Sequence, residues 1–286
     1  MQGQTLETQT PKPRARWKTF GYWARLGIFA LFAGCMVISL GQIAFMHMAT
    51  DANIRPVHSN VDLPEDFDAE EVTFTGGDDL MLAGWYIPPE NETVIILLHG
   101  YDANRTQLLW HAQQLTDAGF GILLYDLRGH GESEGDQRSN GWRDLDDVVG
   151  AVEFLRDKTK VFGIYGFSVG GQIALRATAQ LPDIQAVFVD GPSGTNANDM
   201  PPPINIQEQF VFRLSYIGDR MLSDRTNTPI PQSVMEILPE IAPRPIFFVA
   251  TGQHPMIPGG EARLVRPFYD ITSNHAEWWE IPDTGH

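Results

Sequence analysis

Short, mainly apolar segments alternate with longer amphipathic segments along most of this chain. The apolar segments are five or six residues long, and most are rich in β-branched residues. That composition is typical of strands buried on both faces of a sheet. The segments are 94–98, 121–125, 161–165, 184–189, 245–250 and 277–281, and stretches with helical spacing occupy 104–118, 142–156 and 169–180. Because parallel strands need crossover connections, the alternation predicts an α/β fold with a mostly parallel sheet and helices on both faces.

Two features depart from this alternation. Residues 71–75 and 80–87 have strand character and flank the turn-forming sequence Gly-Gly-Asp-Asp, so we expect an antiparallel hairpin at one edge of the sheet. Residues 191–243 hold a proline-rich segment and one helical stretch. A long insertion between core strands is either a lid over a site or a plain packing helix. We expect the whole globular domain to occupy residues 70–286.

Residues 26–46 contain no charged side chain. A helix needs ~20 mainly apolar residues to cross a bilayer, so this run predicts a transmembrane anchor between a basic tail (1–25) and a linker (47–69). Residues 1–50 carry a net charge of +4 and the remainder −20. Because basic flanks stay on the cytoplasmic side, we expect the N-terminus inside and the main domain outside. A cleaved signal peptide is the alternative, but its apolar core is normally shorter, ~7–15 residues.

The acidic charge of the main domain excludes nucleic acid as a partner, since phosphates would be repelled. The chain has one cysteine, Cys35, which excludes an internal disulfide and a cysteine metal cluster. We see no cofactor motif and expect no cofactor and no metal. The sequence carries no signal for an oligomeric state.

Ser168 is the centre of Gly166-Phe167-Ser168-Val169-Gly170, between a buried strand and a helix. Gly-x-Ser-x-Gly in that context is a nucleophile elbow. The turn is so tight that side chains in place of Gly166 and Gly170 would clash. It holds Oγ exposed at a helix N-terminus, where the dipole favours developing negative charge. The pattern predicts Ser168 as a nucleophile, whereas an ordinary strand-to-helix turn would use the serine only as a cap.

The loop 99–101 (His-Gly-Tyr) follows the apolar strand 94–98. In this architecture that loop supplies one oxyanion donor, and the residue after the nucleophile supplies the second. We assign the two donors to the backbone N–H groups of Tyr101 and Val169, and we expect His99 itself to be structural.

His286 follows the last apolar strand and a turn. In the chain order serine, acid, histidine, the base comes last and reaches the nucleophile from a neighbouring strand end. The pattern therefore predicts His286 as the general base, the alternative being a tail residue without a catalytic role.

These residues resemble the α/β-hydrolase superfamily over about residues 70–286. The likeness is closest to the serine aminopeptidase and monoacylglycerol-lipase-like esterases. It rests on Leu-Leu-His-Gly-Tyr (97–101), Tyr-Asp-Leu-Arg-Gly-His-Gly-Glu-Ser (125–133) and Gly-Phe-Ser-Val-Gly-Gly (166–171). The resemblance implies an α/β-hydrolase fold and a small acyl-containing substrate, namely an ester, thioester or amide cleaved through an acyl-enzyme.

The resemblance also implies that Asp126, Arg128 and His130 stabilise a loop and take no part in the triad. It implies a further helix over one face of the sheet. Since the sequence stops at His286, we expect either that the chain is a fragment or that this face is covered in another way.

The triad acid departs from the family pattern. The resemblance implies Gly-x-x-Asp after the seventh strand, but residues 252–258 contain no carboxylate. Glu261 is the next acid, and Asp190 at the end of the sixth strand is the alternative. Glu261 preserves the order serine, acid, histidine and is therefore preferred. Without an acid that orients the imidazole, the chain would be an inactive hydrolase-fold binding protein. A serine peptidase of the same fold is a further alternative.

Overall fold

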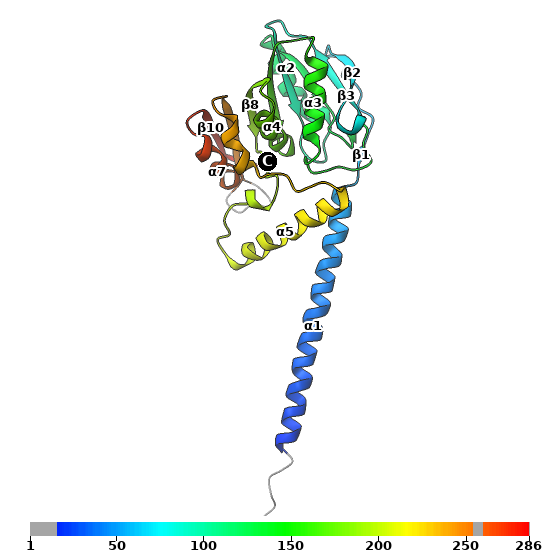
Figure 1. Cartoon of the computed structure of the whole chain (residues 1–286), viewed down its shortest axis with the longest axis vertical. Helices are drawn as coiled ribbons and strands as arrows, with labels where there is room; N and C mark the ends of the chain where they lie inside the picture. Colours follow the sequence, from blue (N-terminus) through cyan, green and yellow to red (C-terminus); the bar gives the residue numbers. More distant parts are fainter. Residues whose placement is uncertain (1–15, 254–259, 286) are drawn as a thin grey trace, which may run out of the picture. The chain divides into compact units, whose positions relative to one another are not determined.

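The structure is a computed structural model that describes residues 16–253 and 260–285. It divides into two compact units, Met1–Ala49 and Thr50–His286. Helix α1 (Arg16–Asn53) forms the first unit and contributes its last four residues to the second (Figure 1). Within the described residues, Gly21–Asn53 is the one helical segment long and apolar enough to cross a membrane, with a mean hydropathy of 2.1. The helix thus extends beyond residues 26–46 at both ends.

The second unit is built on an eight-stranded sheet in the order β10-β9-β8-β7-β4-β5-β3-β2. The strands are β2 (Glu70–Thr75), β3 (Met81–Ile87), β4 (Thr93–Leu98), β5 (Gly121–Tyr125), β7 (Val161–Phe167), β8 (Ile184–Asp190), β9 (Ile246–Gln253) and β10 (Ala276–Gly285). Strands β10, β9, β8, β7, β4 and β5 run parallel, whereas β3 is antiparallel to β5 and β2 to β3. The predicted parallel sheet with an antiparallel edge hairpin is confirmed.

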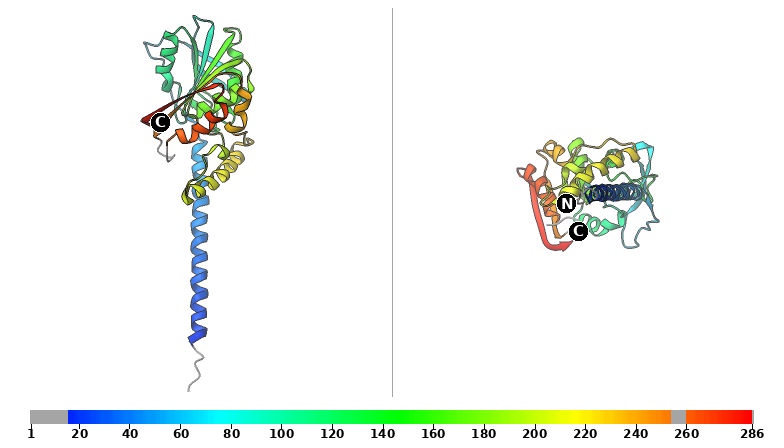
Figure 2. Two further views of the ribbon diagram at one scale, coloured as in Figure 1. Left: turned by 90° about the vertical axis from the view of Figure 1, so that its left-hand side faces the viewer. Right: turned by 90° about the horizontal axis from the view of Figure 1, so that it is seen from below.

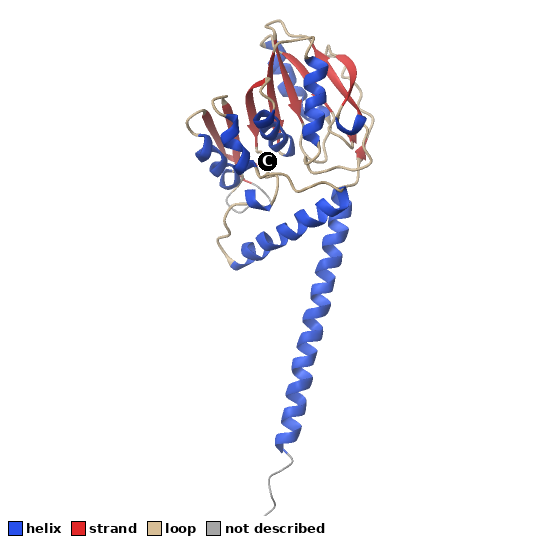
Figure 3. Ribbon diagram, in the orientation of Figure 1, coloured by secondary structure: helices blue, strands red, loops and turns tan. Residues whose placement is uncertain are grey.

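Helices cover both faces of this sheet, as predicted (Figures 2 and 3). Helix α2 (Leu109–Asp117) lies on one face, and α3 (Asp144–Leu155), α4 (Val169–Gln180), α6 (Val234–Ile237) and α7 (Ala262–Thr272) lie on the other. Alternate side chains of β4 divide accordingly. Ile96 and Leu98 join the core under α3 and α4, while Leu97 packs with Ala112 of α2. Both faces of the strand are therefore buried, which explains its wholly apolar sequence.

Two segments outside the alternating pattern pack onto the domain. In the expected linker 47–69, α1 continues to Asn53, β1 (Val57–His58) pairs with β6 (His130–Gly131), and Phe67 is buried. The insertion 191–243 contains the helix α5 (Ile206–Thr226) as well as α6. Short 3₁₀ turns complete the unit at Gly77–Asp79, Arg105–Leu108, Ala197–Asp199 and Leu238–Ile241.

The face that carries α2 is open beyond that helix. A largely apolar cavity of about 710 Å³ lies there, lined by residues of β7, β8 and β9. His111, Tyr165, Phe188 and Phe247 form a row across it, with successive ring centroids 4.9, 5.2 and 4.8 Å apart. In the described part of the chain, no helix covers this row, so the second covering helix implied by the resemblance is not found there.

Gly150 in α3 packs directly against the end of β2, and a Cβ at this position would lie 2.1 Å from the carbonyl oxygen of Thr75. We expect Gly150→Ala to lower the free energy of unfolding by about 1–3 kcal/mol, because the helix must move away from the strand. In α5, by contrast, nothing lies within 4 Å of a Cβ added to Gly218. Gly218→Ala is the matched control and should raise stability by about 0.5–1 kcal/mol. Denaturant unfolding of the full chain in micelles measures both, and a stabilising Gly150→Ala would contradict the close packing.

Candidate active site

Four neighbouring strands, β9, β8, β7 and β4, end at one edge of the sheet because they run parallel. Tyr101 follows β4, Ser168 follows β7, Asp190 ends β8, and Glu261 comes after β9. The carboxyl edge of a parallel sheet is the usual place for a ligand site in such folds. The structure brings these four predicted residues to that edge, while His286 lies outside the described residues.

Ser168 has a backbone conformation that residues other than glycine rarely adopt, with φ 53° and ψ −114°. Such a conformation costs about 1–3 kcal/mol and needs support from its surroundings. The support comes from four backbone hydrogen bonds. The N–H of Ser168 donates to Asp190 O (2.9 Å), and its carbonyl oxygen accepts from the N–H groups of Gly171 (3.0 Å), Ser193 (3.1 Å) and Gln172 (3.4 Å). The side chain is half-buried rather than enclosed.

The glycines on either side of Ser168 are required by close backbone contacts. A Cβ at Gly166 would lie 2.2 Å from the carbonyl oxygen of Gly170. A Cβ at Gly170 would lie 2.2 Å from Leu98 O, at the end of β4. Helix α4 therefore begins in direct contact with the neighbouring strand, which is the tight approach that the Gly-x-Ser-x-Gly pattern predicts.

The two amides assigned as oxyanion donors lie on either side of this contact. Val169 is the first residue of α4, so its N–H has no acceptor within the helix. In the described part of the chain, neither this N–H nor that of Tyr101 makes a hydrogen bond. Gly100 packs beside the elbow, since a Cβ there would lie 2.9 Å from the ring of Phe167. Two unsatisfied donors beside a serine hydroxyl are what stabilisation of an oxyanion requires.

The loop that carries Tyr101 is held by hydrogen bonds at two adjacent residues. Gly100 N donates to Gln107 Oε1 (2.8 Å), and the Tyr101 hydroxyl donates to Asn53 O (2.6 Å). Sequence reasoning missed Gln107. Asn104 caps the following turn by accepting from Thr106 N (3.0 Å), and an asparagine cap three residues before a glutamine is the signal that could have indicated it.

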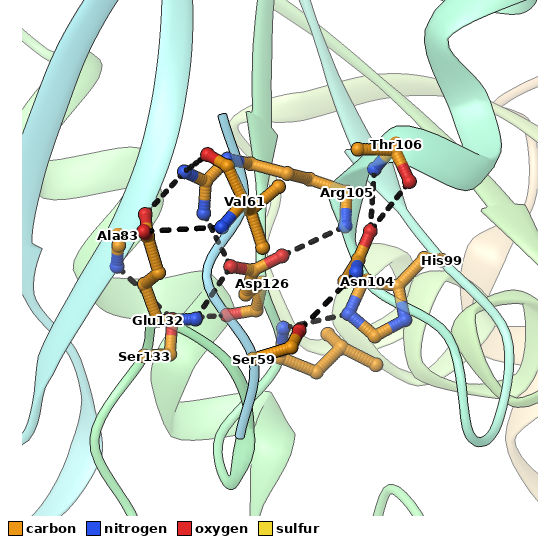
Figure 4. Close-up of polar contacts among 11 residues, drawn as sticks. Ser59, Val61, Ala83, His99, Asn104, Arg105, Thr106, Asp126, Glu132 and Ser133 are labelled. Carbon is orange, nitrogen blue, oxygen red and sulfur yellow. Dashed lines mark hydrogen bonds and ion pairs between the residues drawn. The ribbon is translucent and has the colours of Figure 1, made fainter. Parts of the chain in front are cut away.

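A buried carboxylate joins this loop to the one that follows β5 (Figure 4). Asp126 accepts from the backbone N–H of Arg105 (2.7 Å) and of Glu132 (2.9 Å), and it pairs with the Arg105 guanidinium. The guanidinium also donates to Glu132 Oε2 (2.6 Å) and stacks 4.5 Å over the ring of Trp85. The loop-stabilising role that the resemblance implies for Asp126 is confirmed by these contacts.

Arg128 holds a second part of the same segment. Its Nε and Nη2 donate to the two carboxylate oxygens of Asp147, at 2.7 and 2.6 Å. Asp147 also accepts from Gly77 N (2.9 Å), which ties α3 to the turn between β2 and β3. Arg128 and Asp126 thus fix the loop after β5 from opposite sides, and neither contacts Ser168 in the hydrogen bonds of the described residues.

His99 is fully buried beneath this loop. Its Nε2 accepts from Leu127 N (3.0 Å), so the proton is on Nδ1, which donates to Gly100 O (2.8 Å). Burial lowers the pKa of His99 to about 3, and the ring is therefore neutral near pH 7. The predicted structural role of His99 is confirmed by these contacts, which connect the loops after β4 and β5.

The two candidate acids are held differently. Glu261 is buried, its Oε2 accepts from Thr251 N (2.9 Å), and its own N–H donates to Thr251 O (3.1 Å). Asp190 is half-buried and accepts from the Tyr165 hydroxyl at 3.4 Å. Across the residues described, no group of three histidine, cysteine or acidic side chains could hold a metal ion.

Three comparisons with known proteins agree with this arrangement. The model of the Alpha/beta hydrolase family matches residues 95–286. The uncharacterized protein YfhR of Escherichia coli K12 is 26% identical over 215 residues, which cover 67% of this chain and 75% of that protein. The thiohydrolase aneE of Aspergillus aculeatus is 32% identical over 115 residues, 37% of this chain and 36% of that protein. The esterase Pf2001 of Pyrococcus furiosus superposes with a TM-score of 0.63 at 23% identity, over 81% of this chain and 88% of that chain, and so shares the fold.

The neutral, buried His99 makes stability depend on pH. Because its folded pKa is about 3 and an unfolded histidine titrates near 6.5, the unfolded state binds one more proton between these values. The free energy of unfolding should therefore fall by about 1.4 kcal/mol for each pH unit below 6.5 from this residue. His99→Gln removes this titrating group, so the free energy of unfolding of the variant should change with pH by about 1.4 kcal/mol per unit less than that of the native chain in this range. Denaturant unfolding of both proteins from pH 4 to 8 measures it; the difference above pH 7 gives the lost packing alone, and parallel curves would contradict the assignment.

Proposed function

Because the chain belongs to the α/β-hydrolase family, we propose that it is a membrane-anchored serine hydrolase that cleaves a carboxylic ester, thioester or amide through an acyl-serine intermediate. The observation that carries the proposal is the strained backbone of Ser168 between two close glycine contacts. Strain of this kind persists where it serves a function. Here it presents a half-exposed hydroxyl beside two donors that lack an acceptor among the described residues.

The proposed reaction proceeds in two acyl-transfer steps. In the first, His286 removes the proton from Ser168 Oγ as the oxygen bonds to the substrate's carbonyl carbon. The N–H groups of Tyr101 and Val169 hold the resulting oxyanion. His286 then gives the proton to the leaving alcohol, thiol or amine as the bond to it breaks. In the second step His286 takes a proton from water as the water oxygen bonds to the acyl carbon. His286 then gives this proton to Ser168 Oγ as the ester bond breaks, which releases a carboxylic acid and free Ser168.

Glu261 is the proposed acid that orients His286 and stabilises its protonated form. Its support is burial and the hydrogen bond from Thr251 N, which fix the carboxylate at the end of β9. Asp190 is the alternative, because its backbone lies beside Ser168. An esterase shares the fold, and a thiohydrolase is among the relatives. Both names support carbonyl acyl transfer as the reaction class.

The membrane part of the proposal rests on the apolar helix. Its exposed side chains include Phe29, Leu31, Phe32 and Val37, and a helix that is apolar around its circumference is stable in lipid rather than in water. The basic residues before it and the acidic residues after it favour an orientation with the N-terminus in the cytoplasm and the hydrolase domain on the other side.

An active-site probe tests the nucleophile. We expect a fluorophosphonate to label the detergent-solubilised chain once, and Ser168→Ala to abolish both labelling and hydrolysis of p-nitrophenyl butyrate. Ser193→Ala is the matched control, because Ser193 lies beside Ser168 in the same backbone network and should retain labelling. Labelling that survives Ser168→Ala would refute the assignment, and a chain that neither reacts nor hydrolyses would be the binding protein.

A pair of isosteric variants tests the acid. Glu261→Gln should lower kcat by roughly 10⁴-fold, as loss of the orienting carboxylate does in serine triads, with little change in KM. Asp190→Asn should change kcat by less than about tenfold, since an amide oxygen can still accept from the Tyr165 hydroxyl. Steady-state kinetics on the same ester measure both. The opposite ranking would assign the acid to Asp190 and leave the serine mechanism intact.

A further inference from the structure

Helix α5 exposes apolar side chains that do not pack on the domain. A helix on the surface of a soluble domain turns its apolar face to the core and its polar face to water. In α5 three apolar side chains on one face point outward, with exposed fractions of 83% for Ile206, 50% for Phe210 and 50% for Ile217. Their spacing of four and seven residues places them on one side of the helix. Two further exposed apolar residues, Ile204 and Val211, lie beside them.

The inward side of α5 carries half-buried apolar residues, among them Phe212, Leu214 and Leu222, together with polar residues whose contacts are specific. Glu208 pairs with Arg263 of α7 at 2.8 Å. Asp219 accepts from Ala197 N at 2.7 Å, and the Tyr216 hydroxyl donates to Asn198 Oδ1 at 2.9 Å. These bonds fix the rotation of the helix about its axis, so the outward apolar face is a consequence of the fold.

The C-terminal half of α5 lies beside the end of the apolar helix. Arg225 of α5 pairs with Asp51 at 2.7 Å, and a cavity of about 260 Å³ is lined by Asn53 together with Gly218 and Leu222 of α5. Residues 50–53 belong to the same compact unit as α5. Asp51 is two positions along the chain from Ala49, a chain length of at most about 7 Å. A bilayer that holds the preceding residues of α1 is therefore within reach of α5.

The charges beside the apolar face select the partner. Arg213 and Arg220 are exposed and lie one turn from Phe210 and Ile217 along the same side of the helix. Asp224 lies on that side too and pairs with Arg220 at 3.4 Å, so the stripe keeps a net positive charge from Arg213. The rest of the chain beyond residue 50 is strongly acidic and would be repelled by an anionic surface. An exposed apolar stripe flanked by arginines is the pattern of a helix that lies in the interface of an anionic bilayer.

We propose that the outward face of α5, defined by Ile206, Phe210 and Ile217 with Arg213 and Arg220, docks on the surface of a lipid bilayer that contains anionic lipid. The inference rests on the proposed membrane anchor and is independent of the hydrolase chemistry. Docking removes the three apolar side chains from water and brings the arginines to the headgroup phosphates.

The test uses the full chain reconstituted in vesicles of phosphatidylcholine and phosphatidylglycerol, with a fluorophore on a single cysteine. The native Cys35 reports the anchor. Cys35→Ser with Ile217→Cys reports the outward face of α5. Cys35→Ser with Ile271→Cys is the matched control, because Ile271 is an isoleucine of similar exposure (40%) at the far end of α7. Quenching by lipid nitroxides is measured for each label, with the nitroxide near the headgroup for the labels at 217 and 271 and in the middle of the acyl chain for the label at Cys35, which lies near the centre of the apolar run. Quenching by aqueous iodide is measured for all three.

We expect the label at 217 to be quenched by the lipid nitroxide and several-fold less by iodide than the label at 271. The lipid quenching at 217 should fall when phosphatidylglycerol is omitted, and Arg213→Gln with Arg220→Gln should remove that dependence. A label at 217 that behaves like the one at 271, while the label on Cys35 is quenched by lipid, would overturn this inference and leave the anchor standing. Loss of lipid quenching at both 35 and 217 would overturn both proposals. Protection from iodide at 217 without lipid quenching would place a second protein copy on the face and would also overturn the inference.

Discussion

The candidate site depends on the contact between the first turn of α4 and the end of β4. At Gly170 the helix backbone approaches the carbonyl oxygen of Leu98 so closely that a single methyl group would not fit. This approach sets two adjacent features at once. It forces the chain to turn sharply at Ser168, and it brings the loop after β4 beside the amide of Val169. A strained serine conformation and a pair of unsatisfied donors are therefore consequences of one packing constraint.

The loops around that contact are held by buried polar groups rather than by apolar packing. Arg105 and Asp126 are both buried, so their pairing must offset a large desolvation cost and serves position more than stability. Asp126 satisfies two backbone amides as well as the guanidinium, and neutral His99 connects the same two loops from below. Removing one member of such a network leaves its partner buried and unsatisfied. The Tyr-Asp-Leu-Arg-Gly-His segment therefore fixes the positions of the loops after β4 and β5.

Local patterns in the sequence predicted the parts of the structure that local physics determines. The strands of the sheet and the glycines around Ser168 follow from residues close together in the chain, namely β-branched apolar runs and a turn without room for side chains. The anchoring of Gly100 by Gln107 was missed, because it depends on how a 3₁₀ turn folds back seven residues later. The sequence also does not determine whether Glu261 or Asp190 is the triad acid. Both end or follow neighbouring parallel strands, and only contacts such as that from Thr251 distinguish their surroundings.

The orientation of α5 illustrates a more general limit of periodicity. The apolar residues of this helix recur with helical spacing, and we interpreted the stretch as either a lid or a packing helix. Periodicity identifies which side chains share a face, but it does not identify the medium that the face contacts. In α5 that choice is made by Glu208, Asp219 and Tyr216, whose partners lie in α7 and in the turn at 197–199. Because these polar groups are satisfied inside the domain, the apolar stripe is left outward, next to the residues that lead to the apolar helix. If both α1 and the outward face of α5 contact lipid, the chain is held at the bilayer by two separate segments. The second contact would restrict rotation about the single anchor, which one helix alone cannot do.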